Sequence, residues 1–140
     1  MSRPDRDLEQ LVWQRAQSRC EYCYFPSGYA EAPFQIDHII ALKHGGATES
    51  LNLALSCFYC NSHKGPNIAS IDPTSGRLVR LYHPRRDRWA THFRWEGAKL
   101  AGLTAIGRAT ERALWFNHTL VVETRTWLIA EGVFHASPRA

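Results

Sequence analysis

The chain has 140 residues, of which 44% are hydrophobic and five are tryptophan, and it carries a formal net charge of +4. This composition excludes a disordered chain, and the length suits a single domain with a modest core. Because no apolar run approaches the roughly 18–20 residues that a membrane span needs, the sequence excludes a membrane-spanning protein. The N-terminal sequence MSRPDRDLEQ lacks the apolar centre of a secretory signal, so we expect a cytoplasmic protein with no membrane partner.

The sequence predicts a mixture of helices and short strands. Apolar residues at three- and four-residue spacing indicate helices, as in RDLEQLVWQRAQSRC, whereas strand-forming residues bounded by turn residues indicate strands, as in FQIDHII. In chain order we expect a helix over 6–20, a strand over 34–40, a second strand over 51–57, a short helix over 58–65, a β-hairpin over 71–84 and two amphipathic helices over 109–120 and 122–134. The last two helices are expected to contribute core residues, namely Leu114, Trp115, Trp127, Leu128 and Ile129. We therefore predict an α+β fold and a single domain over residues 1–140.

Four cysteines occur as two C-x-x-C pairs, CEYC (Cys20 and Cys23) and CFYC (Cys57 and Cys60). Disulfides are rare in the cytosol, and two such pairs match the closed tetrahedral shell of a structural zinc ion. The gap between the pairs is longer than in a small zinc ribbon, so further structure is expected between them. A redox role would need only one pair in a βαβ setting, which the sequence does not predict.

Positive charge gathers in one segment. Residues 77–95, RLVRLYHPRRDRWATHFRW, carry six arginines against one aspartate, and aromatic residues lie among them. Arginine with aromatic side chains suits phosphate contact and base stacking, so we expect this segment to bind DNA. The alternative is a solvated hairpin whose arginines serve solubility. The predicted nucleic-acid contacts are Arg77, Arg80, Arg85, Arg86 and Arg88, with Lys64 from an earlier segment.

Residues that could carry chemistry lie between the cysteine pairs and just after them. Asp37 and Asn61 offer the oxygen ligands that Mg²⁺ or Mn²⁺ prefers, and His38 is a suitable general base near neutral pH. Adjacent residues of a strand point to opposite faces, so Asp37 and His38 can share a site only where the strand ends or distorts. Lys64 follows Asn61 by three residues on the same side of the short helix, where it could meet a phosphate.

At these positions the chain resembles the HNH endonuclease family, which folds as a ββα-metal module. The family pattern of C-x-x-C, D-H-I, N-L and C-x-x-C-[HN]-x-x-K is met between Cys20 and Lys64, with Asn61 where the family most often has histidine. The resemblance implies a zinc-stapled ββα-metal core over 20–65, preceded by an N-terminal helix. Residues 66–140 would form an extension with a C-terminal β-hairpin and two helices.

The resemblance also implies roles for individual residues. His38 would activate water, and Asp37 and Asn61 would hold the catalytic Mg²⁺ or Mn²⁺. Asn52 would bond the backbone of the loop between the strands and keep His38 aimed, which makes it the fourth predicted catalytic residue. The cysteines would bind zinc away from the chemistry, and cleavage of DNA would leave 5′-phosphate and 3′-hydroxyl ends.

Three functional hypotheses follow. The first is a metal-dependent endonuclease acting on DNA, as a monomer or a homodimer. The second is a non-catalytic zinc module that binds nucleic acid, which would leave Asp37, His38 and Asn61 unexplained. The third is a redox dithiol protein without bound zinc. His63 also keeps two interpretations, a contact near the metal or phosphate and a solvent-facing helix residue.

Overall fold

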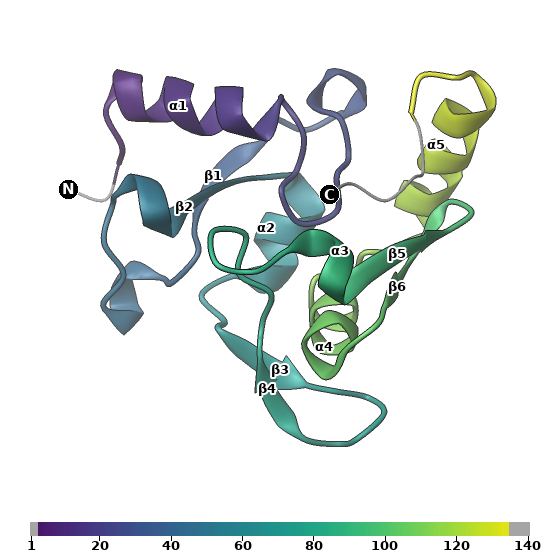
Figure 1. The fold of residues 1–140 in the computed structure, drawn as a ribbon. Coiled ribbons are helices and arrows are strands. Elements are labelled where there is room, and N and C mark those ends of the chain that lie inside the picture. Colours follow the sequence, from purple (N-terminus) through teal and green to yellow (C-terminus); the bar gives the residue numbers. More distant parts are fainter. Residues whose placement is uncertain (1–2, 135–140) are drawn as a thin grey trace. The chain divides into compact units, whose positions relative to one another are not determined.

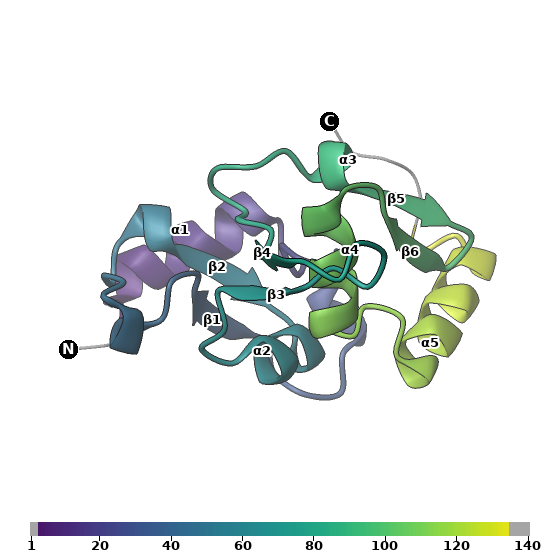
Figure 2. The same cartoon turned by 90° about the horizontal axis from the view of Figure 1, so that it is seen from below.

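The computed structural model describes residues 3–134, which fall into two compact units (Figures 1 and 2). The first unit contains the chain up to Ile68 together with His83–Arg86, and the second contains Ala69–Tyr82 and the chain from Asp87 onward. Helices and small antiparallel sheets occur in both, so the α+β prediction is confirmed. The structure divides the chain into two compact units, and the single domain over residues 1–140 remains a prediction.

The first unit is built on a two-stranded antiparallel sheet. The register pairs Asp37 with Ala54 and His38 with Leu53, and all four residues of the second strand are buried. In both views the hairpin lies between two helices (Figures 1 and 2). These elements are α1 (Arg6–Ala16), β1 (Gln35–His38), β2 (Leu53–Ser56) and α2 (Phe58–Lys64).

Local signals in the sequence set the ends of these helices. The carboxylate of Asp5 accepts a hydrogen bond from the backbone N–H of Leu8 at 2.8 Å and so caps α1. Helix α2 begins after Cys57, whose sulfur accepts from the N–H of Cys60, and it ends at Lys64, with Gly65 as the C-cap. The predicted order of strand, strand and short helix is therefore present at β1, β2 and α2.

The second unit has two antiparallel hairpins and two longer helices. Its elements are β3 (Ala69–Ile71), β4 (Leu78–Arg80), α3 (Trp89–His92), β5 (Phe93–Glu96), β6 (Lys99–Gly102), α4 (Ala105–Ala113) and α5 (Thr119–Ala130). The hairpin predicted over 71–84 is β3–β4, whereas the hairpin β5–β6 was not predicted. Helix α4 approaches α3 closely at Gly107, where an added Cβ would lie 2.1 Å from the carbonyl oxygen of His92.

The predicted core of the last two helices is correct in part. Leu114 and Leu128 are buried, but Trp115 is 49% exposed and Trp127 is 57% exposed, so their assignment to the core is wrong. Helix α4 ends at Ala113, and Trp115 has a left-handed φ of 54° in the turn that follows. Helix α5 buries Val121, and with it Arg125 and Leu128, at positions spaced by four and three residues, which leaves Trp127 off that face.

None of the helices described between residues 3 and 134 is long and apolar enough to cross a membrane.

Candidate metal centre and active site

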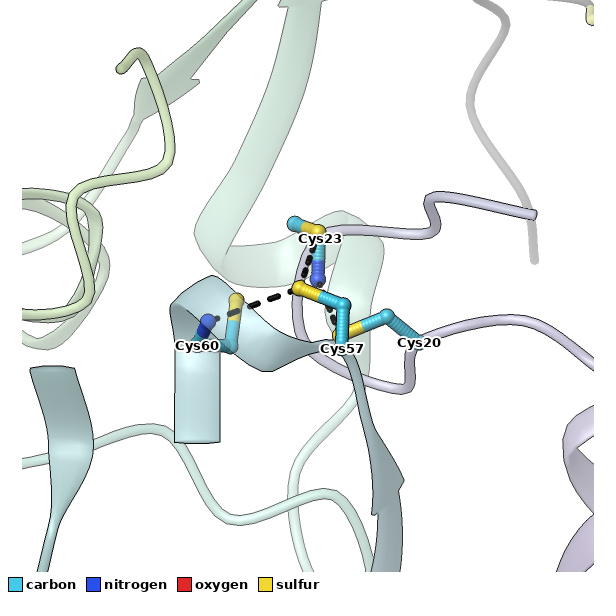
Figure 3. A group of neighbouring side chains, drawn as sticks. All are labelled: Cys20, Cys23, Cys57 and Cys60. Carbon is cyan, nitrogen blue, oxygen red and sulfur yellow. Dashed lines mark hydrogen bonds between the residues drawn. The ribbon is translucent and has the colours of Figure 1, made fainter. Parts of the chain in front are cut away.

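Four cysteine sulfurs converge in the first unit (Figure 3). Cys20 and Cys23 come from the loop after α1, and Cys57 and Cys60 from the start of α2. All four side chains are buried, and their Sγ atoms lie within 4.8 Å of one another. The Sγ atoms of Cys23 and Cys57 are 3.7 Å apart, close to the edge of about 3.8 Å in a zinc tetrahedron with bonds of about 2.3 Å. The cysteines are therefore positioned to form the predicted zinc site.

Backbone N–H groups and burial both affect the ionisation of the cysteine sulfurs. The N–H of Cys23 points at the sulfur of Cys20 at 3.5 Å, and the N–H of Cys60 points at that of Cys57 at 3.4 Å. Burial, followed by hydrogen bonds from the neighbouring sulfurs, raises the pKa of the Cys60 thiol well above its usual range. Four thiolates thus need a cation among them, and zinc binding would release their protons.

Glu21, between the first two cysteines, ties its loop to β2. One carboxylate oxygen accepts from the backbone N–H of Leu55 at 3.0 Å, and the other forms an ion pair with Arg85. Burial lowers the pKa of Arg85 to about 10, and the charge of Arg15 contributes to this shift. Arg85, a predicted DNA contact, is therefore paired with a carboxylate of the loop that carries the first two cysteines.

His38 is the last residue of β1. The strand therefore ends at the point where the side chains of Asp37 and His38 could both contribute to one site. The imidazole is partly exposed, and its Nε2 lies 2.8 Å from the hydroxyl oxygen of Thr48. Among the residues that the structure describes, Nδ1 of this ring has no hydrogen-bond partner. One ring nitrogen is thus anchored and the other is available to a water molecule.

Asp37 is buried and lies among three polar contacts. Its Oδ2 accepts a hydrogen bond from the Tyr22 hydroxyl at 2.7 Å and lies 3.1 Å from Nζ of Lys64, whereas its Oδ1 lies 3.3 Å from that Nζ. Burial raises the pKa of Asp37, and the Lys64 ammonium and the Tyr22 hydroxyl oppose this shift. Burial and the Asp37 carboxylate also raise the pKa of Tyr22.

Lys64 does not lie where a phosphate contact would place it. Its side chain is 2% exposed, and besides Asp37 its ammonium reaches the backbone carbonyl of His38 at 3.2 Å. In this structure the lysine stem turns inward from α2 toward β1 and forms a buried ion pair. The contact of Lys64 with nucleic acid stays a prediction.

The two asparagines differ in their surroundings. Asn52 is buried and bonds the loop backbone, accepting from the N–H of Ile40 and donating to the carbonyls of Ile40 and Ala47, each at 2.9 Å. These are the backbone bonds expected of it. Asn61 is partly exposed on α2, and in the described part of the chain its carboxamide makes no hydrogen bond.

The remaining predicted contacts fall into two groups. Arg77, Arg86 and Arg88 are exposed, which suits phosphate contact. Arg80 is 53% exposed but forms a two-pronged ion pair with Asp87 at 2.7 and 2.9 Å, and this pair raises the pKa of Arg80.

His63 lies on α2, and its Nδ1 is 2.8 Å from the backbone carbonyl oxygen of Tyr59, one turn earlier in the same helix.

Sequence reasoning missed three residues of this site. Glu21 and Tyr22 stand between the first two cysteines, and Thr48 stands in the glycine-rich turn after His38. The signal available for Glu21 and Tyr22 was their place inside a metal-binding loop. For Thr48 there was only a hydroxyl in a short loop that follows a candidate base.

Comparison with protein families identifies residues 20–67 as a match to the HNH endonuclease family. The resemblance drawn from the sequence is thereby confirmed for this segment, which contains all four cysteines and also Asp37, His38 and Asn61. Comparison with curated proteins and with solved structures finds no match.

Proposed function

We propose that this protein, in which residues 20–67 form an HNH endonuclease domain, is a metal-dependent endonuclease that hydrolyses phosphodiester bonds of DNA. The observation that carries the proposal is the family match, because it covers the zinc site and the residues expected to act on the substrate. A nuclease-type function is supported by that match in general. The roles of single residues that follow are part of the proposal.

Asp37 and Asn61 would hold the catalytic Mg²⁺ or Mn²⁺. The donor set fits such an ion, since carboxylate and amide oxygens are the hard ligands that these cations prefer. Oδ1 of Asp37 has only the longer of the two Lys64 contacts, and the carboxamide of Asn61 is without a hydrogen bond to the described residues. When bound, the ion supplies positive charge that stabilises the phosphate oxygens and the leaving group.

His38 would act as the general base. Its Nε2 lies 2.8 Å from the Thr48 hydroxyl oxygen, and its Nδ1 would take the proton of a water molecule that attacks phosphorus. The bond from phosphorus to the 3′-oxygen breaks, and the 3′-oxygen leaves with the electron pair and is protonated by solvent. Arg77, Arg86 and Arg88 would contact the phosphates of the DNA.

The test is cleavage of supercoiled plasmid by the zinc-loaded protein with Mg²⁺ or Mn²⁺. His38→Ala should lower turnover by about two to four orders of magnitude, the usual scale for loss of a general base, while zinc content and DNA affinity are retained. His44→Ala is the matched control, because His44 is exposed in the neighbouring turn. If the wild type nicks plasmid no faster than His38→Ala, the nuclease proposal fails. DNA binding without cleavage would then support the zinc module instead.

A further inference from the structure

The loop that follows β1 presents one hydroxyl to the His38 ring. Nε2 of His38 and the Thr48 oxygen are 2.8 Å apart, a normal hydrogen-bond distance. Thr48 directly follows Ala47, whose carbonyl accepts from the Asn52 carboxamide. The backbone beside Thr48 is therefore held by a buried side chain.

The same loop has little freedom to move. A Cβ added at Gly46 would lie 1.8 Å from the carbonyl oxygen of Ile40 and 2.8 Å from Nδ2 of Asn52. The backbone here packs so closely against the end of β1 that only glycine fits. The bonds from Asn52 to Ile40 close the loop on its other side. The backbone that carries Thr48 is thus positioned by contacts that do not involve His38.

We propose that Thr48 is a positioning residue that binds Nε2 of His38 and thereby assigns the role of proton acceptor to Nδ1. This inference rests on the proposed nuclease function. A neutral imidazole carries one N–H and one lone pair, so the group that accepts from one nitrogen decides which nitrogen can act as a base. With Nε2–H donated to Thr48, the lone pair resides on Nδ1.

With the lone pair on Nδ1, the reaction transfers one proton from water to that nitrogen. The O–H bond of the attacking water breaks, its proton goes to Nδ1, and the electron pair of the water oxygen forms the new bond to phosphorus. Nε2 keeps its own proton throughout, so its hydrogen bond to Thr48 is present before and after the transfer. The opposite arrangement, with the threonine hydroxyl donating to Nε2, would place the proton on Nδ1 and remove the base.

A spectroscopic experiment tests the tautomer directly. The full-length, zinc-loaded protein, labelled with ¹⁵N, is examined by two-bond ¹H–¹⁵N correlation at a pH well above the ordinary histidine pKa, and the His38 signals are assigned with His38→Gln. We expect the Nε2–H form in the wild type and in Thr48→Ser, which keeps the hydroxyl, and a mixture of both forms in Thr48→Val. An Nδ1–H form in the wild type, or an unchanged spectrum in Thr48→Val, would overturn the proposal.

Kinetics separate positioning from a merely structural role. Thr48→Val should lower kcat by about tenfold to a hundredfold with little change in KM, because a base displaced by about 1 Å loses rate on this scale. Thr48→Ser should restore most of the rate, and Thr126→Val, which removes an exposed hydroxyl on α5, is the control. If Thr48→Val lowers only the folded or zinc-bound fraction, with kcat per folded molecule unchanged, Thr48 is structural and the proposal fails.

The two proposals fail in different ways. Absence of His38-dependent cleavage in the wild type would overturn the proposed function, whereas the tautomer measured by NMR would still decide whether Thr48 positions the ring. Cleavage that depends on His38 together with an Nδ1–H tautomer would overturn the role of Thr48 alone.

Discussion

Asp37 and Lys64 form a buried ion pair in the first unit. Both side chains are buried, at 6% and 2% exposure, and the carboxylate also accepts from Tyr22. Burial of two charges is compensated only while both are present, so removal of one partner leaves the other without a counter-charge in a poorly solvated place. The pair joins β1 to α2, the two elements that carry the proposed metal ligands Asp37 and Asn61.

Replacing Lys64 by methionine should therefore destabilise the zinc-loaded protein by about 3–5 kcal/mol, the range found when one partner of a buried ion pair is removed. Urea unfolding of the wild type and the variant measures this difference. Lys99→Met, at an exposed position on β6, serves as control. The double variant with Asp37→Asn should recover part of the loss. A loss below about 1 kcal/mol would show that the pair contributes no more than a surface contact does.

The proposed role of Asn61 as an oxygen ligand of the catalytic ion can be tested by substitution. Asn61→Ala should weaken Mn²⁺ binding by more than about tenfold and lower plasmid cleavage, because it removes a proposed oxygen ligand. Zinc content should be unchanged, since the sulfurs are untouched. Asn67→Ala, at an exposed position just after α2, is the matched control in calorimetric titration with Mn²⁺. Equal Mn²⁺ affinity in both variants would remove Asn61 from the metal site.

At the scale of elements, the strand–strand–helix segment could be predicted because its signals are local. Strand-forming residues, a glycine turn and a cysteine pair stand in sequence order at the places where β1, β2 and α2 begin and end. The end of α4 could not be predicted in this way. The apolar spacing continues past Ala113, and the helix is capped by a left-handed residue, Trp115, at a position that is most often glycine. The N–H groups of Trp115 and Phe116 bond the carbonyls of Arg112 and Glu111, so the cap is local but no glycine marks it in the sequence.

The residues of the candidate site also differ in how far the sequence could predict them. Residue types and spacing predicted the cysteine cluster, because a zinc site needs four sulfur ligands in two such pairs. They also predicted Asp37 and His38 as site residues, which stays a prediction. The inward direction of Lys64 and the partner of His38 depend on how α2 and the loop at 46–50 fold against β1. Such contacts between segments far apart in sequence leave no periodic pattern to recognise.

The turn of the β3–β4 hairpin is held by one buried carboxylate, that of Asp72. It accepts from the backbone N–H groups of Thr74 and Ser75, from the Ser75 hydroxyl, and from Arg108 on α4 at 2.9 and 3.0 Å. These donors, Arg108 foremost, lower the pKa of Asp72 below its usual range. The ionised form therefore stabilises the fold of the second unit.

A pH series tests this stabilisation. Because the folded-state pKa is lowered, the contribution is fully present above the unfolded-state value of about 4 and is lost as the pH falls through the folded-state pKa. Asp72→Asn should be less stable than the wild type near neutral pH, and the difference should shrink in acid below about pH 4. Glu96→Gln, in an exposed pair with Arg94, controls for loss of a surface charge. A difference independent of pH would contradict this account.

At the scale of the whole molecule, zinc binding should contribute to folding. Cys57→Ser removes one of four ligands and should abolish stoichiometric zinc binding and the folded state of the first unit, because structural zinc sites supply about 10 kcal/mol or more of folding free energy. Elemental analysis and circular dichroism follow the two effects. Ser62→Ala, at an exposed position on α2, is the control. A variant that folds normally without zinc would show that packing alone suffices.

DNA affinity is also a property of the whole molecule. Replacing Arg86 and Arg88 by alanine should lower the slope of log affinity against log salt by about two, since each phosphate contact releases about one counterion. The His38→Ala background prevents cleavage during fluorescence anisotropy titrations with a short duplex. Arg94→Ala controls for an exposed arginine that is already paired, with Glu96. An unchanged slope would assign the two arginines to solubility.

The pairing of Glu21 with Arg85 has a consequence for how the protein can be divided. His83–Arg86 belongs to the first unit although the chain has meanwhile passed through the β3–β4 hairpin, so no single cut separates the units. A fragment trimmed to residues 20–67 would also lose Arg15, whose guanidinium bonds the backbone carbonyls of Ser50 and Leu53. Limited proteolysis should accordingly release no autonomous fragment that ends near Ile68, and a minimal folded form of the first unit should extend at least to Arg86.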